Sequence, residues 1–338
     1  MRQKLSVLLV ALMAIVAAAP LSGQDVPKDQ QAEIAIELDM KKLRNNALYG
    51  SVRSNVENLA SQADVPDGLN LEDVDTVFVA VALPDGVTDF AALQQVPAGA
   101  DLPMDMFIRV KFNDSAAVDK LMEKAAADSV EREIGGKKVY SPPASEGPSN
   151  IAVYRADSTT IEFGTDNYIK AGIGNHLLSP GLKSAWDKMP DQALRIAMDL
   201  ENPSDLVSQA VTMAKQNADP MAGGFIELIN KVSDIRITMD LDAGNLLTIM
   251  ANGKDEKSAS ELQMGLDGIL AMGKMGGAQA VQALKEQDEN AAKVVKAILD
   301  SLSAKQDGTE VQIVIPKPDG FEDAVQNMIQ NQMGGAGF

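Results

Sequence analysis

Apolar and polar residues alternate strictly in two segments that lie far apart in the chain, 31–40 and 194–200. Their apolar positions coincide at a constant offset of 160 residues. The matched positions are Ile34 with Leu194, Ile36 with Ile196, Leu38 with Met198 and Met40 with Leu200. A period of two sends successive side chains to opposite faces of a strand. Each segment therefore predicts a β-strand with one buried face.

A second pair of alternating segments, 74–83 and 232–241, follows at an offset of 158 residues. Further strands are predicted at 106–112 and 246–252, and closing strands at 137–141 and 309–315. Apolar residues at helical spacing predict helices at 41–60 and 115–128 in the first half. In the second half they predict helices at 203–217, with Asn202 as N-cap, and from the capping box of Ser258 and Glu261 onward.

Each half thus reads β-α-β-β-α-β, the order of a ferredoxin-like unit, and the predicted class is α+β. We expect an antiparallel sheet with helices on one face. Alternation is common enough to arise by coincidence, but four matched elements in one order favour an internal duplication. The first half adds a hairpin at 149–164, and the second adds helical segments at 278–286 and 288–304.

These patterns divide the chain into a signal peptide at 1–23, a first repeat at 24–178, a connection at 179–191 and a second repeat at 192–338. Arg2 and Lys4 precede an apolar run that is shorter than a membrane span, which is typical of a secretory signal. Cleavage is expected after Ala18 or Gly23, and an uncleaved anchor is the alternative. We expect a secreted or periplasmic protein that does not span the membrane after cleavage.

The amino-acid composition excludes several kinds of functional site and makes some partners unfavourable. The 338 residues include no Cys and one His, so disulfides, cysteine nucleophiles and His-rich metal sites are excluded. Residues Leu21 to Gly23 resemble a lipobox, but Gln24 stands where the lipid-bearing Cys would be. A net charge of -18 disfavours binding to nucleic acid. The 13 aromatic residues, among them a single Trp, weaken the case for a glycosidase.

Four motifs suggest chemistry, and each has a plainer interpretation. Residues 240–245 resemble the start of a calcium loop, but Ala251 stands where an EF-hand needs Glu, which favours a hairpin turn. The acidic run 64–75 is either a cation site or a solvated loop. Residues 272–277 hold two Met near Gly-Gly, typical either of Cu(I) binding or of core filling at a helix end. His176 could serve a serine hydrolase, but the sequence holds no Gly-x-Ser-x-Gly motif to carry the nucleophile. A His in a loop without a catalytic role is the plainer interpretation.

Two other residues receive structural interpretations. Trp186, between the halves, is expected to be a packing anchor. Residues Asn113, Asp114 and Ser115 match the pattern of an N-glycosylation sequon, but a cap at the start of the following helix explains them better. We assign no catalytic, cofactor-binding or metal-binding residue.

The function predicted from these patterns is an exported, acidic, non-catalytic binding, scaffolding or envelope-associated protein. The sequence does not identify its partner, for which a protein and an apolar ligand are the candidates. The first alternative is a carrier of an apolar or amphiphilic ligand in a groove between the repeats. The second is a carboxylate-dependent hydrolase, since the 48 acidic residues offer many pairs.

Overall fold

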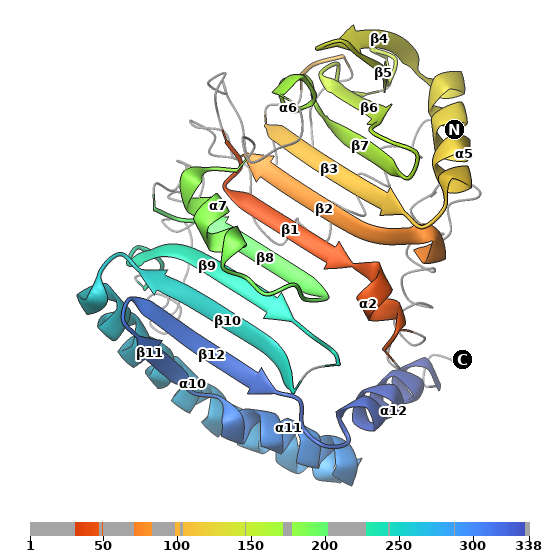
Figure 1. Cartoon of the computed structure of the whole chain (residues 1–338). Coiled ribbons are helices and arrows are strands. Elements are labelled where there is room, and N and C mark those ends of the chain that lie inside the picture. The colour runs from red at the N-terminus through yellow and green to blue at the C-terminus, as the bar shows by residue number, and fades with distance from the viewer. Residues whose placement is uncertain are drawn as a thin grey trace.

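The computed structural model describes residues 31–46, 49, 71–82, 99–101, 104–145, 147–171, 178–201, 228–242, 244–286 and 288–334. The signal segment 1–23, the helix expected at 203–217, most of the one expected at 41–60, and His176 lie outside the described residues. The described chain is a mixed α+β fold with a large antiparallel sheet (Figure 1), which confirms the predicted class.

Within the described ranges, twelve strands form the sheet in the order β11-β12-β10-β9-β8-β1-β2-β3-β7-β6-β5-β4. Their bounds are β1 Ile34–Asp39, β2 Val74–Ala82, β3 Asp105–Phe112, β4 Val130–Ile134, β5 Lys137–Ser141, β6 Ile151–Arg155, β7 Thr160–Thr165, β8 Leu194–Asp199, β9 Val232–Met239, β10 Asn245–Gly253, β11 Ala304–Asp307 and β12 Glu310–Pro316. β1 and β8 are hydrogen-bonded neighbours, so the two halves of the chain share one sheet.

Seven α-helices and one 3-10 turn accompany the sheet in the described residues. They are α2 Met40–Arg44, the 3-10 turn η1 Leu71–Asp73, α5 Ser115–Asp128, α6 Asp166–Ala171, α7 Pro180–Asp187, α10 Glu256–Lys285, α11 Glu289–Ser301 and α12 Phe321–Gly334. The predicted helix 115–128 and the predicted hairpin at 149–164, formed by β6 and β7, are confirmed.

Helices cover both faces of the sheet, so the expected one-sided arrangement is wrong. α5 and α10 pack on the face that carries the large apolar strand residues. α7 lies on the opposite face, over β8 and β9 (Figure 1), and we call this side the α7 face. Ala35, Ala80 and Ala197 are fully buried there. Their short side chains leave room for a helix to approach the sheet closely, which explains why a second face is covered.

The strand order also differs from a ferredoxin-like unit. A split unit separates its first two strands, whereas β1 here pairs directly with β2 in antiparallel fashion. Asp39 lies opposite Thr76, so the chain leaves β1 and enters β2 at the same end of the strand pair. A connection between such ends makes no crossover, because a crossover joins opposite ends of parallel strands.

The registers follow the offsets found in the sequence. Ile36 pairs with Ile196, at an offset of 160, and these two residues pair in turn with Val79 and Ile237, at an offset of 158. The expected match between the closing strands is wrong. β7, and not β5, lies beside β3 as β12 lies beside β10. β5 stands two places farther out, because β6 and β7 return the chain to β3.

The long helix α10 corrects two further expectations. Its N-cap is Asp255, whose carboxylate accepts the N–H of Ser258, in place of the predicted cap at Ser258. The helix also continues through Gly276 and Gly277, where we expected a stop, to Lys285. A Cβ on Gly277 would lie 2.6 Å from Leu299, so this glycine lets α11 approach closely. That contact offsets the usual cost of about 1 kcal/mol for a helical glycine.

Candidate functional site

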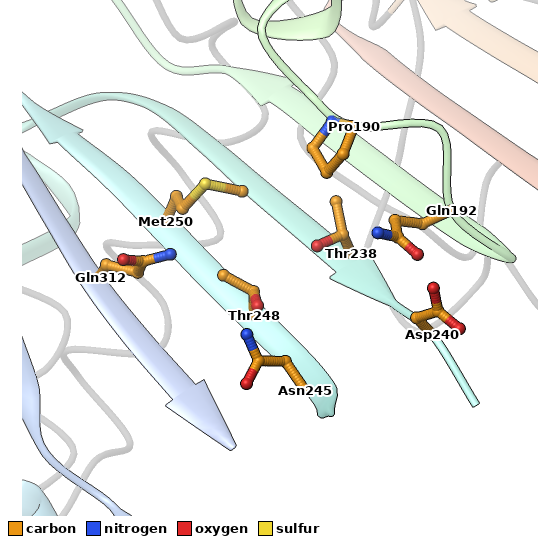
Figure 2. Close-up of a pocket in the computed structure, with 8 residues that line it drawn as sticks. All are labelled: Pro190, Gln192, Thr238, Asp240, Asn245, Thr248, Met250 and Gln312. Carbon is orange, nitrogen blue, oxygen red and sulfur yellow. The ribbon is translucent and has the colours of Figure 1, made fainter. Parts of the chain in front are cut away.

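A pocket of about 270 Å³ lies on the α7 face of the sheet. Its walls come from β9, β10 and β12 and from the loop that joins α7 to β8 (Figure 2). The lining residues are Pro190, Gln192, Thr238, Asp240, Asn245, Thr248, Met250 and Gln312. They all belong to the second half or to the connection before it, so this pocket lies beside the connection and not between the halves.

Strand pairing brings the lining residues together. Thr238 lies opposite Thr248, and Met250 lies opposite Gln312. Directly paired residues of antiparallel strands point to the same face, and residues two apart do so as well. The polar alternate positions of three strands therefore form one surface. The end of α7 and the loop after it place Pro190 and Gln192 above this surface.

A buried ion network lies next to the pocket. Arg236 on β9 is 2 % exposed and lies opposite Met250. Its Nε donates to Asp234 Oδ1 at 3.0 Å and its Nη2 donates to Glu310 Oε2 at 2.5 Å. Asn252 also donates to Asp234. Two carboxylates thus engage the guanidinium, which makes Arg236 part of the framework and not a binding group for an anion.

Hydrogen-bond acceptors gather at one end of the pocket, where Figure 2 draws Gln192, Thr238 and Asp240. The Oε1 atom of Gln192 is buried, and within the described residues it receives no hydrogen bond. The Oδ1 atom of Asp240 accepts the N–H of Asp242 at 2.8 Å. A buried amide oxygen without a donor is costly, so a ligand that donates there would relieve that cost.

A second polar cluster lies under α6. Tyr154 and Glu162, at 6 % and 1 % exposure, are hydrogen-bonded to each other. Arg109 Nε donates to Glu162 at 3.0 Å, and Lys137 Nζ donates to the Tyr154 hydroxyl at 3.2 Å. Burial, and then the hydrogen bond to Glu162, raise the pKa of Tyr154. The groups compensate one another, so this cluster serves the fold.

A third cluster surrounds Asp105, which accepts hydrogen bonds from Thr165 and Asn167. Tyr168 lies nearby at 4 % exposure, and its hydroxyl has no partner in the described chain. Burial, followed by the charges of Asp105 and Glu33, raises the pKa of Tyr168.

The predicted hairpin turn at 240–245 is confirmed, since β9 and β10 pair on either side of it. Of the acidic run 64–75, only the part from Leu71 is described, and there Arg44 binds Asp75. Within the described ranges, no three acidic or His side chains come close enough to hold a metal ion.

Of the three remaining interpretations from the sequence, two are confirmed and one is wrong. Trp186 packs edge-on against Phe78 at 5.5 Å between ring centroids, which confirms the packing anchor. Asp114 caps α5 by accepting the N–H of Ala116, which confirms the cap at the sequon. Met272 and Met275 are exposed in the middle of α10, so the prediction of core filling at a helix end is wrong.

Sequence reasoning missed the pocket residues. Thr238, Thr248 and Gln312 occupy the polar positions of alternating strands, which are ordinarily taken as solvent-facing. The burial of Thr238 at 5 % exposure departs from that rule. The pattern in the sequence that could have pointed to them is the presence of uncharged polar residues on the strands that flank a short hairpin.

Comparisons with known proteins assign neither a family nor a function to this chain. No protein-family model matches the chain, and no curated protein matches it. Three crystal forms of TP0453, forms IV, III and I, are partly similar, with TM-scores of 0.39, 0.38 and 0.37 and identities of 9, 8 and 9 %. The alignments cover 90, 90 and 91 % of this chain and 97, 97 and 98 % of those chains. Overlap at this level defines neither a common fold nor a common function. In the part of the chain that is described, no helix has the length and apolar character needed to span a bilayer.

Proposed function

We propose that this chain is a non-catalytic binding protein that holds a small polar ligand in the pocket over β9, β10 and β12. The observation that carries the proposal is the lining, which combines amides and hydroxyls with a single ionisable side chain, Asp240. Such a surface offers hydrogen bonds without the paired titratable groups on which acid–base or nucleophilic catalysis depends.

The proposal retains export to the periplasm or the cell exterior, on the strength of the basic and apolar N-terminal segment. It also retains an internal duplication. The registers support this because β1–β2 and β8–β9 set corresponding residues opposite one another. On this account the two halves share an ancestor, and the pocket is formed by the second half together with Pro190 of the connection before it.

The test is a binding screen of neutral, cationic and anionic small molecules, followed by two-dimensional NMR of the full chain. Thr248→Phe fills the pocket and is expected to abolish the shifts of pocket signals. Thr309→Phe, a matched change in the exposed turn before β12, is expected to leave them unchanged. Turnover of an ester, glycoside, peptide or phosphate substrate that Thr248→Phe abolishes would overturn the proposal.

A second candidate function, a carrier of an apolar ligand, has one observation in its favour. On β9 the polar residues Asp234, Arg236 and Thr238 are buried, whereas the intervening Ile235, Ile237 and Met239 are only partly buried. The large apolar residues of β1 and β8, which are Ile34, Ile36, Leu38, Leu194, Ile196 and Met198, are likewise partly buried. This central apolar surface, opposite the α7 face, is where a lipid chain would bind.

Native mass spectrometry of protein purified from its own cells distinguishes the two candidates. Bound lipid that is retained in Thr248→Phe and lost in Ile237→Thr would favour the carrier. A protein free of lipid would remove it.

A further inference from the structure

We infer that the long helix α10 forms a contact between two copies of this chain, which pack against each other in antiparallel orientation. The contact surface is a row of exposed, uncharged residues that we call the α10 stripe. It consists of Met264, Gly268, Ala271, Met272, Met275 and Gln279. The inference is independent of the proposed ligand pocket, because no residue of α10 lines that pocket.

The stripe occupies one side of α10. Its members recur at intervals of three or four residues, which places their side chains in one row along a helix. The opposite side of α10 carries Leu262, Leu266 and Leu270, which pack in the core of the second half. Figure 1 shows α10 at the β11 end of the sheet, at the boundary of the molecule. A second helix can therefore approach the stripe.

The stripe holds most of the exposed large apolar side chains of the described ranges. Met264, Met272 and Met275 are 65, 39 and 69 % exposed, and the one other such residue there is Val130 on β4. Clustered apolar residues on a surface mark an interaction site, and methionine adapts its flexible side chain to a partner. Because the stripe carries no charge, a second copy can cover it without burying an unpaired ion.

The shape of the stripe is complementary to itself. A Cβ on Gly268 would meet no atom within 4 Å, so the helix surface is open there. Gly268 and Met275 lie at equal sequence distances from the midpoint of the stripe, between Ala271 and Met272. In an antiparallel pair with its two-fold axis at this midpoint, Met275 of each copy packs over Gly268 of the other.

The charged residues beyond the ends of the stripe favour the same orientation. Lys257 and Glu286 are exposed and lie at equal sequence distances from the same midpoint. Lys257 makes a long ion pair with Glu261, at 3.9 Å, and its side chain is 85 % exposed. An antiparallel pair sets Lys257 opposite Glu286 of the other copy at both ends. A parallel pair would set like charges opposite each other, which is unfavourable.

The charge of the chain favours a second copy over a lipid surface. The net charge is -18, and α10 holds as many acidic as basic residues, unlike the basic helices that bind anionic bilayers. This charge also opposes association, and a contact of one helix from each copy is small. We therefore expect a transient dimer with a Kd on the order of 10 µM. Below about 1 µM, the range suited to fluorescence-monitored unfolding, the single chain predominates and Met275 is exposed to solvent.

Analytical ultracentrifugation of the full chain measures dimerisation, at an ionic strength of about 0.15 M that screens the net charge. Gly268→Glu places a charge under Met275 of the other copy and should weaken the dimer about tenfold or more. Gly273→Glu is the matched control, because Gly273 also lies in α10 with no atom within 4 Å of its Cβ, but off the stripe. Its dimer should be as strong as that of the wild type.

Charge reversal tests the orientation. Lys257→Glu alone sets two acidic residues opposite each other at both ends of the contact and should weaken the dimer. Glu286→Lys alone does the same with two basic residues. The double variant restores opposite charges and should regain the affinity of the wild type, a recovery that misfolding cannot mimic.

Single cysteines test the register, since the chain contains no other. Ala271→Cys lies beside the two-fold axis and should form a disulfide-linked dimer on mild oxidation with diamide. The two copies of Met264→Cys lie about 22 Å apart along the helix axis, at 1.5 Å per residue. A disulfide needs Cα atoms within about 7 Å, so this variant should form no linked dimer.

Four outcomes would overturn the inference. The chain stays monomeric at about 1 mM, far above the expected Kd. Gly268→Glu and Gly273→Glu weaken the dimer equally, which would place the contact elsewhere. Met264→Cys forms a linked dimer as readily as Ala271→Cys, which would exclude the antiparallel register. Finally, a monomeric chain binds phosphatidylcholine vesicles and Gly268→Glu abolishes that binding, which would make a bilayer the occupant of the stripe.

Discussion

Arg195 on β8 stacks over Trp186 on α7, with 4.5 Å between its guanidinium carbon and the ring centroid. The same guanidinium binds Glu37 across the β1–β8 pair at 2.5 Å, with both side chains largely buried. One residue therefore connects the helix on the α7 face with the two strands at which the halves meet. Since Trp186 is the sole tryptophan, its fluorescence reports on that junction.

A double-mutant cycle with Glu37→Gln and Arg195→Met should give a coupling energy of about 1 kcal/mol, because the pair is shielded from solvent. Urea unfolding followed by Trp186 fluorescence measures it. The matched control is the exposed pair of Glu131 and Lys138, whose side chains are 57 and 59 % exposed. That pair should show no measurable coupling. Equal coupling in the two cycles would contradict the role assigned to Arg195.

Adjacent glycines of α10 should respond differently to alanine. A Cβ on Gly276 meets no atom within 4 Å, whereas one on Gly277 meets Leu299. Gly276→Ala should raise the free energy of unfolding by about 1 kcal/mol through helix propensity. Gly277→Ala should gain less or lose stability, since Leu299 must move. Thermal unfolding compares the two, and equal stabilisation would show that α10 and α11 do not pack closely at Gly277.

The packing of α7 predicts a large effect at Leu182, which is fully buried against the alanines of the sheet. Leu182→Ala should cost about 2–5 kcal/mol of unfolding free energy. Met275→Ala is the control, because that side chain is 69 % exposed on α10 and its truncation should change stability by no more than about 0.5 kcal/mol. A large loss in Met275→Ala would mean that Met275 is covered.

The two buried tyrosines of the α7 face should differ at neutral pH. Tyr168→Phe removes a hydroxyl without a partner in the described chain and should be neutral or stabilising. Tyr154→Phe removes the hydroxyl that binds the buried Glu162 and should cost about 1–3 kcal/mol. Chemical denaturation at pH 7 measures both variants. A larger loss in Tyr168→Phe than in Tyr154→Phe would contradict these environments.

Alkaline pH adds a second test of Tyr168. Its pKa is raised in the folded protein, so its contribution is complete below the ordinary pKa near 10. The contribution is lost as the pH rises through the folded value, because the unfolded state ionises first. Tyr168→Phe should therefore lose less stability than the wild type above about pH 10. Identical alkaline profiles would show that Tyr168 is accessible to solvent.

Local patterns predicted the strands well where one face is apolar. The alternation at 74–83 and 232–241 corresponds to β2 and β9 within two residues at each end. The edge strand β4 was missed because Glu131, Arg132 and Glu133 give it a charged sequence, as suits an unpaired edge. Its turn depends on the positive φ angles of Gly135 and Gly136, a signal that was present in the sequence.

The order of the strands and the pocket could not be predicted from local sequence patterns. Periodicity shows which face of a strand is apolar, but it does not show which strand pairs with which, since pairing depends on contacts between distant residues. Thr238 and Thr248 become neighbours through the β9–β10 pairing, and Gln192 reaches them through the position of α7. Gly276 and Gly277 misled the helix prediction because the compensating contact with Leu299 lies in another helix.

The pairing of Ile36 with Ile196 has a consequence for how such a chain could have arisen. On the proposed duplication these are the same position in two copies, and antiparallel pairing sets that position against itself. A contact in which the same residue of two identical copies meets is an isologous contact, related by a two-fold axis. A half-length ancestor could then have formed a homodimer edge to edge through this strand, in the present register. Gene fusion would have turned that subunit interface into the middle of one continuous sheet.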